Sequence, residues 1–236
     1  YGILIGEFCD GSSELEQSMD YIFENSGVPA CVSSGNEGAY PYHGVAEIPA
    51  GELVEIPVSV GVGMHGTYMM RINLRWQDEF EPFTFALEDP EGNQVELSHT
   101  GTDGVPMGDD AMVMSFGIAT SERGTSVLSG RIRNPESSWQ NPVTLLSGQY
   151  KLFVLNEAAE DRSLDVIMAS MFTGDSVNLP DHYSPLGTIT WPSTGDTVFS
   201  AGASVHNEGA VDDLDHAATL AGYSRPGPRV DGERAP

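Results

Sequence analysis

The stretch VPACVSSGNEG, residues 28–38, organises the expected fold. Its first half is a short apolar run, typical of a buried strand, and the run ends at Gly35. Glycines at positions 35 and 38 allow a sharp turn and a close approach of the backbone to a ligand. Asn36 lies between them. We therefore expect a carboxamide at the end of a strand, where its N–H group can donate to an oxyanion. An ordinary Gly-Asn turn is the alternative.

The residues before this stretch predict a strand and then a helix. Residues 2–6 form a short apolar run, and Ser13 with Glu16 fits a capping box at a helix start. Gly27 fits a left-handed cap at the helix end. The apolar residues expected on one face of this helix are Leu15, Met19, Ile22 and Phe23. Strand, helix and strand together predict a β-α-β unit, whose ligands bind at the carboxyl ends of the strands.

From His43 onwards the pattern changes to period-two alternation in short segments, separated by Gly, Pro and Asp turns. This pattern predicts a β-sandwich, and roughly eight strands favour a jelly roll over about residues 44–178. Residues 197–203 then predict another buried strand. The apolar sets that alternate include Ile56, Val58 and Val60; Met70, Ile72, Leu74 and Trp76; Met112, Met114, Phe116 and Ile118; Tyr150, Leu152 and Val154; and Leu164, Val166 and Met168.

The charge of the chain limits its partners. The formal net charge is −25, from 35 acidic and 10 basic residues, and Lys151 is the only lysine. Such a surface repels phosphate backbones and anionic lipid, so we expect no nucleic-acid partner. No apolar run is long enough to span a membrane, so we expect no membrane partner either. The chain opens inside an expected strand, and we expect it to be part of a longer protein.

Two cysteines are too few for a disulfide scaffold or a zinc site. Cys31 alternates within the expected strand and is interpreted as a buried small side chain. A Cys9–Cys31 disulfide between neighbouring strands is the alternative that the sequence leaves open.

Several segments, in the same order, resemble the subtilisin-like serine proteases. Residues 33–38 resemble the oxyanion-hole segment of that family, and residues 4–6 take the place of a segment whose backbone pairs with substrate. Residues 188–203 and 223–232 resemble two later segments of the family. The inserted sandwich, residues 10–16 and the position of His43 resemble the clostridial Csp-like branch. Leu4 departs from the usual serine, and residues 225–227 are shuffled against the family pattern.

The resemblance implies an α/β subtilisin-like parallel sheet, interrupted by an all-β jelly-roll insert and β-rich overall. The expected domains are residues 1–43 and 179–236 for the core and 44–178 for the insert. It implies a secreted or extracellular serine endopeptidase, with the periplasm or cell surface as alternatives, acting on peptide or protein substrates. Asn36 becomes the oxyanion-hole donor. The implied substrate-binding residues are Leu4, Ile5, Gly6, Ser33, Ser34 and Gly35.

The catalytic Asp, His and Ser of the family cannot be placed in this sequence, so the chain alone is expected to be inactive. His65 and the run Gly124-Thr125-Ser126 mimic the family's His and Ser motifs, but both lie inside the insert. Residues 127–130, which follow that run, are expected at an edge of the sandwich. The other histidines are expected to be solvated or locally bonded. Met112 and Met114 are expected in the core.

Calcium is the one cofactor that the sequence leaves open, through the acidic loops at Asp109-Asp110 and residues 212–215, against the alternative of ordinary solvated loops. A different function also remains open. The sandwich would then be a non-enzymatic binding module, for carbohydrate, calcium or protein, on a pseudoprotease scaffold.

Overall fold

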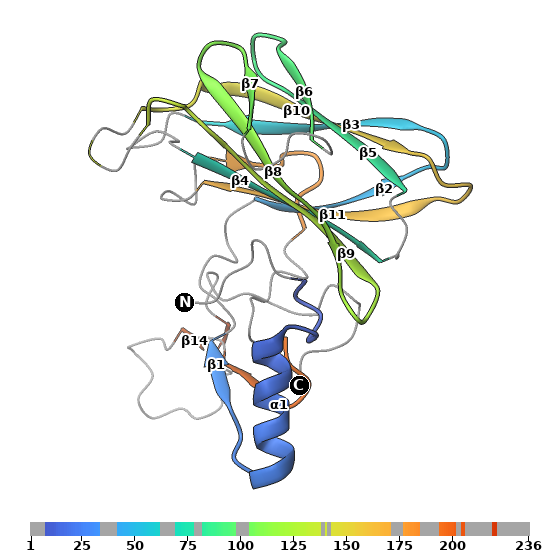
Figure 1. The fold of residues 1–236 in the computed structure, drawn as a ribbon, viewed down its shortest axis with the longest axis vertical. Coiled ribbons are helices and arrows are strands. Elements are labelled where there is room, and N and C mark those ends of the chain that lie inside the picture. The colour runs from blue at the N-terminus through green and yellow to red at the C-terminus, as the bar shows by residue number, and fades with distance from the viewer. Residues whose placement is uncertain are drawn as a thin grey trace. The chain divides into compact units, whose positions relative to one another are not determined.

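A computed structural model gives the fold of the chain. It describes residues 8–33, 42–61, 69–77, 82–97, 104–137, 140, 143–170, 177–184, 194–201, 204–205 and 219–220. The chain divides into two compact units (Figure 1). The first comprises Tyr1–Leu4, Cys9–Ala39 and Pro185–Pro236, and the second comprises Ile5–Phe8 and Tyr40–Ser184.

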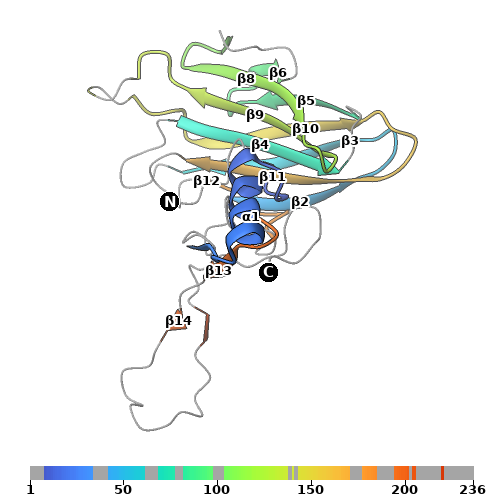
Figure 2. The same cartoon turned by 60° about the horizontal axis from the view of Figure 1, so that its bottom comes forward.

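The second unit is built from two antiparallel sheets, so the protein is β-rich as expected. The five-stranded sheet has the order β12 (Val177–Asn178), β3 (Leu53–Val60), β10 (Gly148–Asn156), β5 (Phe83–Glu88) and β6 (Gln94–Glu96). The six-stranded sheet has the order β2 (His43–Ile48), β11 (Arg162–Ser170), β4 (Met69–Gln77), β9 (Thr125–Arg133), β8 (Ala111–Thr120) and β7 (Val105–Met107). Figure 2 shows β4, β9 and β8 side by side in the latter.

One apolar core joins the facing sides of the two sheets. The alternating sets supply it as predicted, because side chains two apart in a strand share a face. Trp76 packs edge-on against Phe83, with ring centroids 5.7 Å apart and an interplanar angle of 89°. Core residues from the alternating sets include Ile56, Val58, Val60, Met70, Ile72, Leu74, Tyr150, Leu152, Val154, Leu164, Val166 and Met168.

Strand β8 departs from the predicted pattern. Val113, and not Met112 or Met114, joins the apolar core, although Ile118 packs against it as expected. Met114 is buried as predicted, but on the other face of the strand from Val113. The pairing of β8 with β9 shifts register between Ser115 and Ile118. A bulge of this kind inserts an extra residue and exchanges the two faces of the strand beyond it. A strict period-two reading therefore assigned the two methionines to the wrong face.

In the first unit, helix α1 (Glu14–Ser26) has both predicted caps. Ser13 and Glu16 form the capping box, and Gly27 ends the helix with φ of 68°. The predicted apolar face is only partly covered. Leu15 and Ile22 are 40% and 53% exposed, whereas Met19 and Phe23 are half-buried. Glu16 is buried, and its hydrogen bonds are described below.

Strand β1 (Cys31–Ser33) is shorter than predicted and pairs in parallel with β13 (Phe199–Ala201), 168 residues further along the chain at the Cys31↔Phe199 position. Burial was predicted wrongly for Cys31, which is exposed, and for Phe199 in β13, while Val198 is buried. Cys9 and Cys31 are both free thiols. Strands β14 (Ser204–Val205) and β15 (Thr219–Leu220) form an antiparallel pair. The predicted strand at residues 2–6 lies outside the described residues.

Within the described residues, none of the helices has the length and apolar character needed to cross a membrane.

Candidate functional site

Ser33 is the one predicted site residue that the structure describes. It is the last residue of β1, it pairs with Ala201, and it is exposed. The other predicted site residues, Leu4, Ile5, Gly6, Ser34, Gly35 and Asn36, lie outside the described residues. The structure therefore shows the strand that leads into the predicted oxyanion segment, and the neighbour of that strand.

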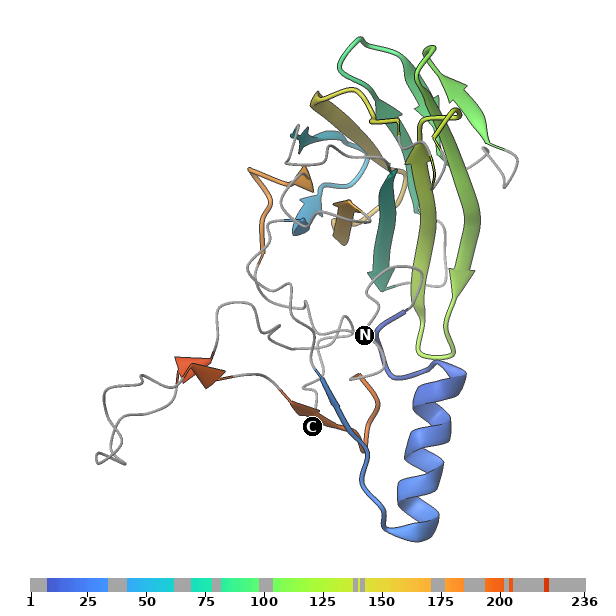
Figure 3. The same ribbon diagram turned by 90° about the vertical axis from the view of Figure 1, so that its left-hand side faces the viewer.

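Helix α1 anchors the segment that leads into β13. Asp20 accepts hydrogen bonds from the Thr197 amide at 2.7 Å, from the Thr197 hydroxyl at 2.6 Å and from the Asp196 amide at 3.1 Å. One turn earlier, buried Glu16 accepts from the Thr194 hydroxyl. Figure 3 shows α1 beside the β1–β13 pair. Two carboxylates on one helix face thus fix the approach of β13 to β1.

Sequence reasoning found only half of this anchor. It assigned Glu16 to the capping box, and the Ser13 hydroxyl does donate to Glu16 at 2.7 Å. It missed the second partner of Glu16 and the whole role of Asp20. The available signal was their spacing, since residues four apart share a helix face. Nothing local pointed to partners 176 residues away, the separation of Asp20 from Asp196.

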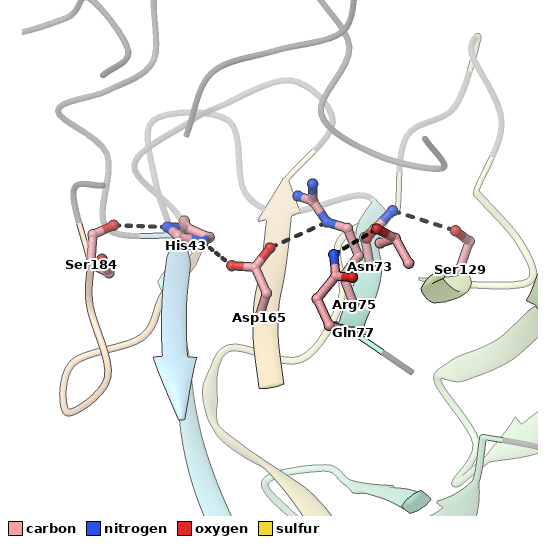
Figure 4. Close-up of polar contacts among 8 residues, drawn as sticks. His43, Asn73, Arg75, Gln77, Ser129, Asp165 and Ser184 are labelled. Atoms are coloured by element: carbon pink, nitrogen blue, oxygen red, sulfur yellow. Dashed lines mark hydrogen bonds and ion pairs between the residues drawn. The ribbon is translucent and has the colours of Figure 1, made fainter. Parts of the chain in front are cut away.

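A buried polar cluster lies on the face of the six-stranded sheet opposite the core. Its central residue is Asp165 of β11, which lies between His43 of β2 and Arg75 of β4 (Figure 4). His43 and Arg75 are fully buried, and the Asp165 side chain is 15% exposed. The Arg75 Nε atom lies 3.3 Å from Asp165 Oδ2. The prediction of a solvated or locally bonded His43 was wrong, because its partners are 122 and 141 residues away.

The two contacts of His43 occupy both of its ring nitrogens. Its Nδ1–H donates to the Ser184 carbonyl at 2.8 Å, since a carbonyl only accepts. Its Nε2 faces Asp165 Oδ1. Burial alone would raise the pKa of Asp165, but the charges of His43 and Arg75 and the hydrogen bond from His43 hold that pKa below its ordinary value. Whichever of Nε2 and Oδ1 holds the proton between them, the His43–Asp165 pair is neutral overall.

This cluster contains His, Asp and Ser but is not a catalytic triad. In a triad the carboxylate orients one ring nitrogen while the other takes a proton from the nucleophile. Here the second nitrogen meets the Ser184 carbonyl, which is not a nucleophile. Both nitrogens are occupied by these contacts, so His43 has no nitrogen left to act as a general base in this arrangement.

The fold is similar to that of a solved protease. The structure of the CspB protease of Clostridium perfringens matches with a TM-score of 0.67 and 18% sequence identity, over 95% of this chain and 43% of that chain. The chain therefore spans less than half the length of the protein it resembles. Identity this low is evidence for the fold alone. No family model matches the chain, and no curated protein matches it.

The two sequence mimics of catalytic motifs have different outcomes. His65 lies outside the described residues. Residues 127–130, which follow the run Gly124-Thr125-Ser126, were predicted at an edge of the sandwich. This was wrong, because β9 lies between β4 and β8 inside the sheet. Thr125 and Ser126 are buried at the start of that strand. Thr125 accepts a hydrogen bond from the Gln77 amide at 2.7 Å, so its hydroxyl is part of the sheet's polar face.

The acidic loops are the places where the sequence left calcium open. Among the described residues, no three or more His, Cys, Asp or Glu side chains gather closely enough to hold an ion. This part of the chain includes Asp109 and Asp110, whereas residues 212–215 lie outside it.

Proposed function

We propose that this chain is part of a subtilisin-like serine endopeptidase, secreted or extracellular, that hydrolyses peptide bonds. The first unit would be the protease core and the second an inserted sandwich. Asn36 would supply the oxyanion-hole donor. Leu4, Ile5 and Gly6 would pair with the substrate backbone as an added strand. Ser33, Ser34 and Gly35 would form part of the pocket for the residue before the scissile bond.

One observation carries this proposal: the parallel pairing of β1 with β13. It unites two parts of the chain that resemble consecutive segments of the protease family, although the whole sandwich lies between them in sequence. The likeness to the CspB protease over 95% of the chain supports the same arrangement. Residues 34–36 follow directly from the carboxyl end of β1, which is where parallel sheets present their ligand sites.

The proposed chemistry assigns this chain to stabilisation of the transition state. When a serine attacks the peptide carbonyl, negative charge develops on the carbonyl oxygen. A carboxamide N–H aimed at the position of that oxygen stabilises the charge without reorganisation. A rigid support matters for this role, because small displacements of a donor weaken it. The hydrogen bonds of Glu16 and Asp20 to residues 194–197 would provide that support.

The test uses the longer protein that contains this chain. Asn36→Ala should lower kcat about 100- to 1,000-fold with little change in KM, as loss of an oxyanion-hole donor does in subtilisin. Asn25→Ala is the matched control, because Asn25 only bonds the Tyr21 carbonyl on the exposed side of α1. Full activity of the Asn36 variant would refute the assignment. The 236-residue chain itself should not react with a fluorophosphonate probe.

A further inference from the structure

We propose that the outer face of the six-stranded sheet holds an anion site centred on Arg75, which takes a single carboxylate group. The outer face is the side of that sheet opposite the apolar core. The site is the free edge of the Arg75 guanidinium, beside the His43–Asp165 pair and Asn73. This inference does not depend on the proposed proteolytic function.

The first observation is an unsatisfied buried cation. Arg75 is 0% exposed, and Asp165 is the one described carboxylate that approaches it, 3.3 Å from Nε. Its two terminal nitrogens, Nη1 and Nη2, have no hydrogen-bond partner among the described residues. In Figure 4 they point away from Asp165. A buried guanidinium is costly unless its donors are paired, so these nitrogens identify a position where an acceptor belongs.

The second observation is the charge of the cluster. His43 Nδ1–H donates to the Ser184 carbonyl and one further proton lies between Nε2 and Asp165, so the His43–Asp165 pair is neutral overall. Asp165 is the one carboxylate that faces His43 and Arg75 among the described residues. Arg75 is always protonated, so this described cluster carries an excess of one positive charge. A monoanion would neutralise it, whereas a phosphate dianion would leave an excess negative charge in its place.

The wider sheet face adds positive potential. Strand register places Arg71 of β4 directly opposite Arg131 of β9, so two further cationic side chains lie on this face. Arg71 and Arg75 are four residues apart in one strand, so they share this face at a spacing of about 13 Å. The chain has only 10 basic residues against 35 acidic ones, and this grouping is therefore notable in an otherwise negative protein.

The shape of the site favours a carboxylate. Nη1 and Nη2 form a planar fork that matches the two oxygens of a carboxylate in a bidentate pair. Asn73, buried two residues away on the same face, donates to Ser129 at 3.4 Å and leaves its oxygen without a partner. Exchanging the amide oxygen and nitrogen would let the Ser129 hydroxyl donate to Asn73 and would free an N–H donor. That N–H group would then donate a hydrogen bond to the same carboxylate.

The carboxylate has two sources, a small anion from solution or an Asp or Glu side chain of this chain. In the first arm, the melting temperature of the 236-residue chain is followed in sodium formate and in sodium chloride at equal ionic strength. A free anion predicts a saturable rise specific to formate, about 5 °C or more at 100 times the dissociation constant. Arg75→Gln should abolish the rise. Arg123→Gln, which removes an exposed arginine, should keep it.

The second arm detects a carboxylate of the chain. In protein labelled with ¹³C at Asp and Glu carboxyl carbons, Arg75→Gln in an Asp165→Asn background should shift one further carboxyl signal. Arg75→Lys, which keeps the charge but not the fork, serves if the glutamine variant does not fold. Either a formate-specific rise or a second shifted carboxylate supports the site and names its source. The absence of both overturns the proposal.

Discussion

Replacing Asp165 with asparagine tests the account of the buried cluster. The substitution keeps the size of the side chain and removes the only described carboxylate that faces His43 and Arg75. Breaking a buried ion pair by removing one partner typically costs about 3–5 kcal/mol, because it leaves an uncompensated charge. Arg75 is fully buried and cannot recover its hydration, so the cost should lie in that range. In a chain of this length, that corresponds to a fall in Tm of about 6–20 °C.

The same substitution should change the response to acid. The pKa of Asp165 is held below its ordinary value in the folded protein. A carboxyl of this kind contributes stability above its unfolded-state pKa of about 3.9, and that stability is lost as the pH falls through the lower folded-state value. The difference in unfolding free energy between wild type and Asp165→Asn should therefore be constant near neutral pH and shrink below about pH 4.

Urea unfolding, followed by circular dichroism between pH 7 and pH 3, measures both effects. Glu157→Gln is the control, because it removes one negative charge at an exposed position of the same unit. It should change stability by less than about 0.5 kcal/mol. If Asp165→Asn costs no more than this control, or if the difference persists unchanged at pH 3, the cluster does not stabilise the fold as argued.

The remaining predictions concern one residue in each unit, Asp20 in the first and Tyr150 in the second. Asp20→Asn should weaken three hydrogen bonds to residues 196–197 and cost about 2 kcal/mol; protection of the β13 amides from hydrogen exchange should fall with it, and unchanged protection would contradict the anchoring role. Tyr150→Phe removes a 3.1 Å hydrogen bond to the Leu146 carbonyl and should cost about 1 kcal/mol in urea unfolding at pH 7. Burial, followed by the charge of Asp89, raises the pKa of the Tyr150 phenol, so wild-type stability should fall as the pH rises above about 10. Tyr150→Phe should not show this loss of stability. Identical plots of unfolding free energy against pH for wild type and variant above about pH 10 would contradict the prediction.

Local sequence signals predicted much of the framework. Period-two alternation gave the strands and core residues of the sandwich, because the pleat of a strand sends alternate side chains to opposite faces whatever the partner strand. The capping box and Gly27 gave the limits of α1, because both act within one turn of the helix. Prediction failed at β8, where a bulge between Ser115 and Ile118, whose position depends on pairing with β9, puts Met112 and Met114 on the opposite face from Ile118.

The polar contacts of the chain could not be found in this way. His43, Asp165 and Arg75 each look like an outward-facing polar residue of an alternating strand, and nothing in their local pattern indicates burial. They meet because β11 lies between β2 and β4, with Asp165 opposite Arg75 in register. The same holds for β1 and β13, which pair although the whole sandwich separates them in sequence. Periodicity is a property of neighbours along the chain, whereas strand order and register emerge only when distant segments pack, and these decide which charges face each other.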